Sequence, residues 1–464
     1  MFGYIEDIVK RQKEFFKSGK TLEISFRKEQ LKKLYTAIEN NERELTEAVR
    51  KDLNKPEFET FETEIGLIKI DIKEAIKKID KWSKPQNRGQ SFMSPMAKNK
   101  IYKQPYGVCL ILSPWNYPVQ LSIEPLIGSI SAGNCSVIKL SELSPNTSGV
   151  LKEILEDTFD ENYVAVFDGD AEEGNYLINS EFDYIFYTGS PEIGSKVAVA
   201  AGKNLIPYTL ELGGKSPCIV EKSADIDFTA KKIIWGKLLN SGQTCIAPDY
   251  IIADKSIYDE LIKSMIKYVE KFYGKNPVES SDYPKIVNKK NYDRILSLID
   301  SENIIYGGNS DDNSMKIAPT FLKVDNMNSK IMKEEIFGPV LPIITFEDKE
   351  EILDIVEKNK NPLALYIFTT DNSFEKEIIN RISFGGGCIN DTIMHCSISK
   401  LPFGGVGRSG IGSYHGKMSF DAFSHNKSIV KSGRTGDIFT SMKYPPYTEK
   451  NLKILKKLFK FMEI

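Results

Sequence analysis

The sequence predicts an α/β protein with two open parallel-sheet domains, each a series of alternating strands and helices. Short, continuous apolar runs bounded by turn residues indicate strands that are buried on both faces. Segments with apolar residues at helical spacing lie between these runs. The 464 residues suffice for two or three domains, and a content of 41% hydrophobic and 27% charged residues is typical of a folded globular chain.

Helices are expected over the first eighty residues. Residues 27–51 and 63–82 carry apolar side chains at helical spacing, with charged residues between them. At 84–103 the composition changes to Pro, Gly, Asn and Ser with short apolar pieces, which favours an exposed loop or hairpin. Strands are then expected at residues 108–112, 136–140, 163–167 and 184–187, with a helix at 147–158.

A second series of strands and helices begins near Thr209. Its expected strands are residues 217–220, 250–253, 341–345 and 365–369, and its long helices are residues 224–240 and 256–272. The chain up to residue 208 is therefore interpreted as one α/β domain and residues 209–418 as another. Near the end, residues 450–464 predict a basic amphipathic helix. Its apolar face either packs on the body of the protein or meets a membrane surface or a long-chain substrate.

The composition disfavours several classes of function. With 62 basic and 64 acidic residues the net charge is -2, which gives no electrostatic reason to expect nucleic acid as a partner. The cysteines include no CxxC pair and, with only 3 histidines, they predict no metal site; they favour a reduced, cytoplasmic protein. Residues 1–21 are charged and do not predict a secretory signal, and no long apolar window predicts a membrane span.

The first candidates for chemistry are a thiol and a carboxyl group. Cys245 ends the run Asn240-Ser-Gly-Gln-Thr-Cys245, just after a helical segment, which favours an exposed helix end where the pKa of a thiol can fall. An isolated cysteine is usually a small buried apolar side chain, but the Gly-Gln-Thr-Cys context favours a nucleophile. Glu211 follows a strand end and precedes two glycines; a carboxylate there can accept a proton, although a lone Glu beside a turn is usually just solvated.

Three further groups of residues follow expected strands, where ligands bind in parallel α/β sheets. An Asn can donate a hydrogen bond from its side-chain amide to an oxyanion. The alternative is an ordinary turn residue between two prolines. A glycine loop that opens a helix can bring backbone N–H groups to an anion, although many strand-to-helix turns share this pattern. A Lys and a Glu can hydrogen-bond ribose hydroxyl groups, or they form a surface ion pair. These groups are Asn116; Gly189, Ser190 and Gly194; and Lys139 with Glu142.

Five motifs follow one another along the chain: Trp115-Asn116, Phe186-Tyr-Thr-Gly189-Ser190, Glu211-Leu-Gly-Gly, Gly242-Gln-Thr-Cys245 and Glu334-Glu-Ile-Phe-Gly-Pro339. Their order and spacing resemble the aldehyde dehydrogenase superfamily from about residue 27 to residue 430. Finer features resemble its class 3 and fatty-aldehyde branch. These are the short N-terminus, Gln243-Thr-Cys-Ile-Ala-Pro-Asp-Tyr250, Leu401-Pro-Phe-Gly-Gly-Val-Gly-Arg-Ser-Gly410, Tyr414-His-Gly-Lys417 with Ser419-Phe420, and Tyr444-Pro-Pro-Tyr447.

The resemblance implies an aldehyde dehydrogenase-like fold with two Rossmann-like domains and a small β region for oligomerisation. The cofactor-binding domain would comprise residues 1–83 with 104–208, and the catalytic domain residues 209–418. Residues 84–103 with 419–435 would form the bridging region of a homodimer, and residues 436–464 a tail with the amphipathic helix. Five lysines in the final fifteen residues oppose a spanning role for that helix, which leaves peripheral contact with a membrane.

The resemblance also implies a reaction and its residues. An apolar aldehyde, of medium or long chain or aromatic, would be oxidised to its carboxylic acid. Cys245 would be the nucleophile, Asn116 an oxyanion donor and Glu211 the base that activates water, with no metal.

Other residues are implied for cofactor and substrate. The cofactor would be NAD, with NADP open; Glu142 favours NAD because a carboxylate repels a 2′-phosphate. Glu335 and Phe337 would hold its nicotinamide ribose and ring, Lys139 and Glu142 its adenosine ribose. Tyr117, Trp235 and His415 are candidate substrate residues; for the two aromatic residues, ordinary core packing is the alternative.

Two other functions remain open at this point. Release of the thioester to coenzyme A instead of water would need no water-activating base, so Glu211 argues against it. A non-catalytic structural or binding descendant of the fold is disfavoured because Cys245, Asn116 and Glu211 occur together.

Overall fold

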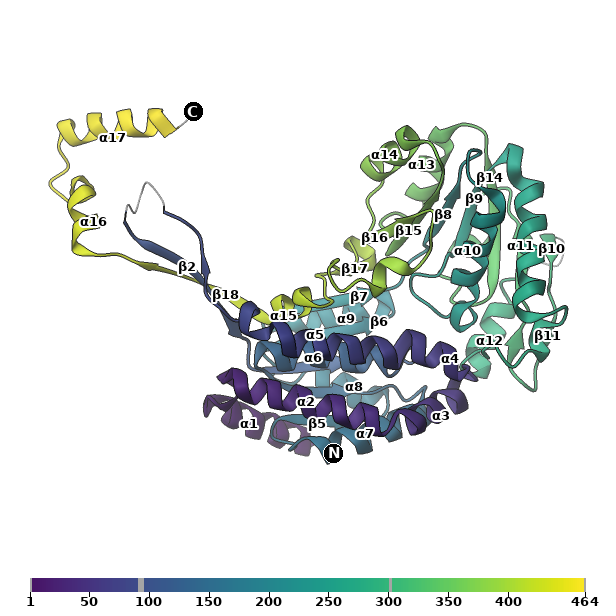
Figure 1. Ribbon diagram of the computed structural model, residues 1–464, viewed down its shortest axis with the longest axis horizontal. Coiled ribbons are helices and arrows are strands. Elements are labelled where there is room, and N and C mark those ends of the chain that lie inside the picture. Colours follow the sequence, from purple (N-terminus) through teal and green to yellow (C-terminus); the bar gives the residue numbers. More distant parts are fainter. Residues whose placement is uncertain (1, 91–95, 300–302, 463–464) are drawn as a thin grey trace.

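The computed structural model describes residues 2–90, 96–299 and 303–462. Two α/β lobes lie side by side, and a narrow arm of strands leaves the first lobe and ends in the C-terminal helices (Figure 1). The predicted α/β class, with two parallel-rich sheets and a small antiparallel one, is confirmed. The residue limits of the domains stay a prediction.

The first lobe is built on a six-stranded sheet in the order β17-β7-β6-β3-β4-β5. Its strands run parallel except for β17, which pairs antiparallel with β7. Every residue of β3 is buried, which explains why this strand is a continuous apolar run. The strands are β3 (Val108–Leu112), β4 (Cys135–Lys139), β5 (Val164–Phe167), β6 (Tyr184–Gly189), β7 (Tyr208–Leu212) and β17 (Gly410–Ile411).

Helices cover this sheet and confirm the helical N-terminal region (Figure 1). The periodicity over 27–51 belongs to two helices, because α2 ends at Asn40 and α3 begins at Glu42. Between them Asn41 leaves the helical conformation and its side-chain amide donates to the carbonyl of Ala37, 2.8 Å away. The helices are α1 (Gly3–Lys17), α2 (Ile24–Asn40), α3 (Glu42–Leu53), α4 (Glu57–Thr60), the π-helical turn η2 (Phe61–Ile65), α5 (Gly66–Trp82), α6 (Gln120–Ala132), α7 (Pro145–Thr158), α8 (Ala171–Ile178) and α9 (Pro191–Lys203).

The second lobe is built on a seven-stranded sheet in the order β10-β13-β14-β9-β8-β15-β16. Only β10 runs antiparallel to its neighbour among these described strands. The strands are β8 (Pro217–Val220), β9 (Tyr250–Asp254), β10 (Ile304–Tyr306), β13 (Thr320–Lys323), β14 (Val340–Phe346), β15 (Ala364–Phe368) and β16 (Gly386–Ile389); a separate hairpin is β11 (Ser310–Asp311) with β12 (Lys316–Ile317). The helices are α10 (Ile226–Leu238), α11 (Tyr258–Tyr273), α12 (Lys289–Leu296), α13 (Lys349–Glu357) and α14 (Asn372–Arg381). A later helix, α15 (Lys417–Ala422), packs on α6 of the first lobe.

The arm is a three-stranded antiparallel sheet of β1 (Gln86–Asn87), β2 (Lys98–Pro105) and β18 (Ser424–Lys431). β18 pairs with β2 along its whole length, from Ser424 opposite Pro105 to Lys431 opposite Lys98. Of the expected loop or hairpin at 84–103, the hairpin is confirmed, because β1 pairs antiparallel with β2. Residues 91–95 lie outside the described residues.

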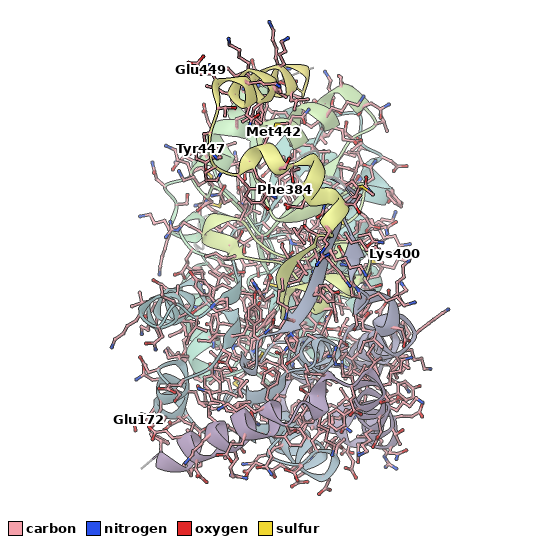
Figure 2. The ribbon with its side chains drawn as sticks, turned by 90° about the vertical axis from the view of Figure 1, so that its left-hand side faces the viewer. Glu172, Phe384, Lys400, Met442, Tyr447 and Glu449 are labelled. Atoms are coloured by element: carbon pink, nitrogen blue, oxygen red, sulfur yellow. The ribbon has the colours of Figure 1, made fainter. Side chains whose placement is uncertain are left out.

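The C-terminal segment continues beyond the arm as α16 (Arg434–Phe439) and α17 (Glu449–Met462). Figure 2 faces the arm, and Met442, Tyr447 and Glu449 mark this segment there. The apolar side chains of Leu452, Leu455 and Phe459 on α17 are exposed, so the helix does not pack its apolar face on the body of this chain. Among the described residues, no helix is long and apolar enough to cross a membrane.

The sheet of the first lobe positions the site. β3, β6 and β7 lie next to one another and run parallel, so their carboxyl ends meet at one edge. That edge faces the second lobe (Figure 1). Residues that follow β3 and β6, and those at the end of β7, are therefore brought together at the junction of the lobes.

Candidate active site

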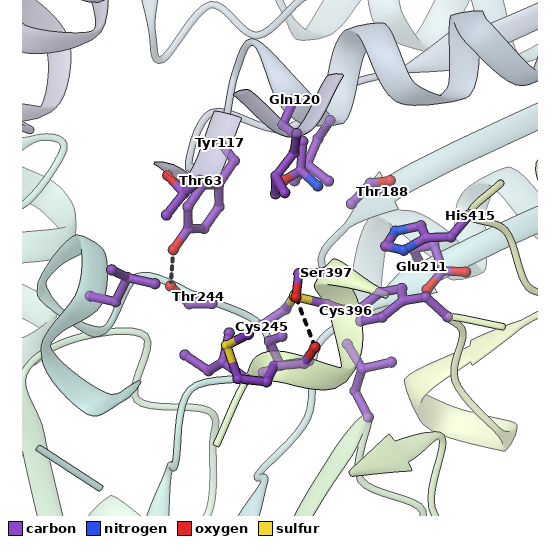
Figure 3. A pocket seen from close by; sticks show the side chains of 18 of the residues that line it. Thr63, Tyr117, Gln120, Thr188, Glu211, Thr244, Cys245, Cys396, Ser397 and His415 are labelled. Atoms are coloured by element: carbon purple, nitrogen blue, oxygen red, sulfur yellow. Dashed lines mark hydrogen bonds between the residues drawn. The ribbon is translucent and has the colours of Figure 1, made fainter. Parts of the chain in front are cut away.

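Two cavities meet at the junction of the lobes. The larger, of about 380 Å³, is lined mostly by apolar side chains, and the smaller has a volume of about 270 Å³. Cys245 and Glu211 line both cavities, and Figure 3 shows them together with His415 around the larger one. The fold thus brings the predicted thiol and carboxyl group, which come from different lobes, to a common wall.

A sharp turn after α10 delivers Cys245 to this wall. Asn240 and Ser241 have left-handed backbone conformations, with φ of 50° and 52°, in the short helix η3 (Leu239–Gly242). Cys245 is half-buried, and burial raises the pKa of its thiol, with further increases from Glu335, Cys396 and Glu211. The expectation that this helix end lowers the thiol pKa is wrong, because desolvation and nearby acidic groups outweigh the turn.

Asn116 lies on the loop between β3 and α6 and lines the smaller cavity together with Cys245. Its Nδ2 donates one hydrogen bond to the carbonyl of Gln243, 3.0 Å away. An amide nitrogen carries two protons, so one remains for a ligand. Gln243 is itself fixed, because its side chain bonds the backbone of Asn240 and Val287.

Glu211 lies near the end of β7 and is buried. Within the described part of the chain, neither of its carboxyl oxygens has a hydrogen-bond partner. Burial raises the pKa of Glu211 well above its usual value, and the nearby carboxyl of Glu124 raises it further. Glu211 is therefore placed to exchange a proton with whatever occupies the cavity.

The smaller cavity collects four of the predicted cofactor residues: Gly189, Ser190, Glu335 and Phe337. Gly213 leaves room for the Glu335 carboxyl, which an added Cβ would displace. Burial raises the pKa of Glu335 to about 8, with a further increase from Asp249. The hydroxyl of Thr188, buried and without a partner among the described residues, also lines this cavity. A carboxyl, a hydroxyl and a glycine-bounded cradle fit a ribose and a flat ring.

The other predicted cofactor residues lie outside the lining of this cavity. Lys139 Nζ is 3.2 Å from Glu142 Oε2, so the two residues pair with each other. Gly194 lies in α9, where it allows close contact with the side chain of Leu212 on β7. Its glycine is thus explained by helix packing.

All three candidate substrate residues line the larger cavity: Tyr117, Trp235 and His415. The Tyr117 hydroxyl bonds Thr244 Oγ1 at 2.6 Å (Figure 3). The His415 ring stacks on Phe403, with centroids 5.0 Å apart. Burial lowers the pKa of His415 to about 4, and the Nε2 of its ring lies 3.4 Å from Glu124 Oε1.

Several residues that support the site were missed from the sequence. Lys55 and Glu64 form a buried ion pair beneath the Asn116 loop, and Glu124 contacts His415 from α6. Lys215, paired with Asp249, donates to the carbonyls of Ile331 and Glu334 at 2.9 Å each and so holds the segment that carries Glu335. Lys55 and Glu64 sit among many charged residues, and nothing in the local pattern marks them as buried. Glu124 did carry a signal, because it is the only charged residue between positions 104 and 138, in a largely apolar stretch.

Comparison with known proteins adds a further line of support. The chain matches the model of the aldehyde dehydrogenase family over residues 4–429. It is 48% identical over 451 residues to the 4,4'-diaponeurosporen-aldehyde dehydrogenase of Staphylococcus aureus, covering 97% of each chain. It is 40% identical to the dimeric NADP-preferring aldehyde dehydrogenase of Canis lupus familiaris, over 95% of this chain and 98% of that one. The solved substrate-bound state of Staphylococcus aureus AldH superimposes with a TM-score of 0.95 at 46% identity, covering 98% of this chain and 99% of the other.

Proposed function

The chain belongs to the aldehyde dehydrogenase family and is an aldehyde-oxidising oxidoreductase that resembles the class 3 branch; from that premise we propose that it converts an apolar aldehyde to its carboxylic acid through a thioester on Cys245. The observation that carries the proposal is the common wall of the two cavities. Cys245 and Glu211 line both, and the larger cavity is mostly apolar. An aliphatic or aromatic aldehyde suits such a lining.

The reaction begins at the thiol. Cys245 loses its proton to solvent, and the sulfur forms a bond to the carbonyl carbon while the carbonyl electron pair moves to oxygen. The free amide proton of Asn116 and the backbone N–H of Cys245 are the donors for that oxyanion. Removing one such donor costs about 2.7–4 kcal/mol in comparable sites.

A nicotinamide cofactor, when bound, supplies a hydride acceptor for this chemistry. Glu335 and Phe337 would hold its ribose and ring, and Gly189 and Ser190 would meet its phosphates at the start of α9. We keep NAD as the expected cofactor because of the carboxylate of Glu142. A relative bears the name NADP-preferring, so NADP stays a candidate.

Hydrolysis completes the turnover. The Glu211 carboxylate takes a proton from water, the water oxygen bonds to the thioester carbon, and the carbon–sulfur bond breaks. The sulfur leaves as a thiolate, ready for the next aldehyde. Glu211 then returns its proton to solvent.

The proposal also covers assembly and location. The arm of β2 and β18 would join two copies in a homodimer. The protein would be cytoplasmic, with the exposed apolar face of α17 and its lysines in peripheral contact with a membrane.

Reduced-nicotinamide absorbance tests the proposed reaction. Wild-type protein with NAD or NADP and a medium-chain or aromatic aldehyde is expected to show continuous turnover. Cys245→Ala is expected to be inactive, and Glu211→Gln to give at most a burst. Wild-type protein that is silent until coenzyme A is added would replace hydrolysis with acyl transfer, and cofactor binding without turnover of any aldehyde would indicate a non-catalytic protein.

Flotation with liposomes tests the tail. The full chain is expected to float with vesicles that contain anionic lipid, and Leu455→Glu together with Phe459→Glu is expected to abolish flotation while aldehyde turnover persists. Leu22→Glu, at an exposed leucine near the start of the chain, is the matched control. No cofractionation of the full chain, with or without anionic lipid, would refute membrane contact.

A further inference from the structure

We infer that Lys55 and Glu64 are positioning residues, a buried ion pair that fixes the amide of Asn116 in the orientation needed to meet the oxyanion. The inference rests on the proposed function, in which Asn116 is that donor. Both side chains are fully buried, with 0% exposure each, and Lys55 Nζ lies 2.7 Å from Glu64 Oε1. Lys55 lies in the loop between α3 and α4, and Glu64 lies in η2, so neither belongs to the sheet edge that carries the site.

The pair holds the loop after β3 at two points. Lys55 Nζ donates to the carbonyl of Asn116 at 3.3 Å and lies 4.1 Å from the centroid of the Tyr117 ring. Glu64 Oε2 accepts the backbone N–H of Val119 at 2.8 Å. One ion pair thus binds the loop at Asn116 and again at Val119, the residue before α6 begins.

Helix α4, which lies between Lys55 and Glu64 in the sequence, also holds the turn that leads to the thiol. Glu59 Oε1 accepts the backbone N–H of Asn240 at 2.7 Å. Asn240 Nδ2 in turn donates to the carbonyls of Asn116, at 2.8 Å, and Gln243, at 3.2 Å. The loop with the proposed oxyanion donor and the turn before Cys245 are therefore fixed against one common support.

These contacts define the plane of the Asn116 side chain. Its backbone carbonyl is held by Lys55 and Asn240, and its Nδ2 is held by the carbonyl of Gln243. The remaining amide proton has one direction left. Oxyanion donors act through such preorganised geometry, and small misplacements are costly.

The burial of these two charges is better explained by the positioning of the loop than by a gain in the stability of the fold. Desolvation of a buried pair offsets most of its attraction, so apolar residues of similar size would stabilise the fold equally well. The loop between residues 116 and 119, however, offers a carbonyl that accepts a second hydrogen bond beside that from Asn240, and an N–H that needs an acceptor. Lys55 and Glu64 supply these two functions without leaving a net charge between them.

A double-mutant cycle tests the inference. Lys55→Met with Glu64→Gln removes both charges and keeps the approximate volume, and it is made in wild-type protein and in Asn116→Ala. Asn116→Ala is expected to lower kcat/KM for the aldehyde about 100-fold or more. The pair variant is expected to lower it roughly 10-fold in wild-type protein and less than about 2-fold in Asn116→Ala, because coupled residues do not add. Binding of NAD, followed by fluorescence, is expected to stay unchanged.

Each outcome has one meaning. Equal losses on both backgrounds, or no loss on either, would overturn the inference and leave the proposed function intact. If Asn116→Ala itself keeps full activity, the proposed oxyanion role fails and the inference fails with it. If the pair variant does not fold, Lys55→Met alone, which leaves a carboxyl that can take up a proton and stay neutral, carries the same cycle. Lys69→Met, which breaks ion pairs to Glu39 and Glu42 at the surface of α5, is the matched control and is expected to be fully active.

Discussion

Cys245 and Glu211 act as anions in the proposed reaction, yet the structure disfavours the anionic form of each. Burial is the largest cause of the raised pKa in both cases, and Glu211 also raises the pKa of Cys245. The carboxyl of Glu124, buried on α6, adds to the effect on Glu211. The ionisation of these two groups is therefore expected to govern how the rate depends on pH.

The first prediction concerns this pH dependence. A group with a raised pKa is protonated below that pKa, so the fraction of Glu211 able to take a proton from water grows as pH rises. Steady-state turnover is expected to increase from pH 6 to pH 10. Glu211→Gln is expected to remove the increase from the hydrolytic step and leave it in the burst, which reports thiolate attack. Stopped-flow absorbance separates the two phases, and a pH-independent turnover in wild-type protein would contradict the assignment.

The second prediction concerns Glu124. Its carboxyl accepts from the amide of Gln120 at 3.0 Å and raises the pKa of Glu211. Glu124→Gln removes the carboxyl that raises the pKa of Glu211, so that pKa is expected to fall and the pH profile of steady-state turnover to move to lower pH. The profile is expected to move by less than the full increase in the pKa of Glu211, because burial contributes more to that increase than Glu124 does. Glu74→Gln, at a half-buried ion pair with Lys78, serves as control, and an unmoved profile for Glu124→Gln would refute the coupling.

At the scale of elements, one ion pair of the second lobe connects the residues before β8 and β9 to the segment that carries Glu335, beside the smaller cavity. Lys215 pairs with Asp249, just before β9, and donates to two carbonyls of the segment 331–334. Asp249 accepts the backbone N–H of Ile336 at 3.0 Å. The segment that carries Glu335 is thus fixed at both ends by one pair.

The third prediction follows from that arrangement. Lys215→Met removes two hydrogen bonds to the segment and leaves the charge of Asp249 unpaired, so the affinity for NAD is expected to fall about tenfold, or about 1.4 kcal/mol. The apparent KM for the aldehyde is expected to change less, because the larger cavity does not include this segment. Titration calorimetry measures the affinity. Lys255→Met, at an exposed pair with Glu347, is the control, and equal losses for cofactor and aldehyde would argue for a general loss of structure.

Strongly periodic elements were predictable, and weak ones were not. The buried strand β3 has the predicted limits of residues 108–112, and α10 lies within the predicted helix at 224–240. By contrast β16, with the sequence Gly-Gly-Cys-Ile, carries no strand signal of its own, and it exists because it pairs with β15. The break at Asn41 was invisible because the apolar periodicity continues across it.

The residues of the site show the same difference between what the sequence could predict and what it could not. Cys245, Glu211 and Asn116 stand in motifs, so their roles could be proposed from the resemblance, and the fold places them along adjoining cavities. The direction of the thiol pKa depends on which groups surround the sulfur, and no local pattern contains that information. Lys55 and Glu64 likewise look like any surface pair until the fold buries them.

At the scale of the whole molecule, the arm leaves a sheet edge unpaired in the single chain. β18 is the last strand in the order β1-β2-β18, and its Ile429 and Val430 are 42% and 59% exposed. Exposed edge strands with apolar side chains are usually covered by another chain or element. The arm also stands away from both lobes, where a second copy can reach it (Figure 1).

The last prediction is that the arm joins two copies. Sedimentation velocity is expected to show a dimer, and Ile429→Lys with Val430→Lys to shift it toward the monomer, because two charges replace the apolar side chains of the edge. Val199→Lys, at an exposed valine on α9, is the matched control and is expected to remain dimeric. Dimers that persist in the arm variant would locate the contact elsewhere. Because the cavities are formed within one chain, the dissociated variant is expected to keep its burst of reduced nicotinamide, and loss of the burst would show that the site depends on the partner.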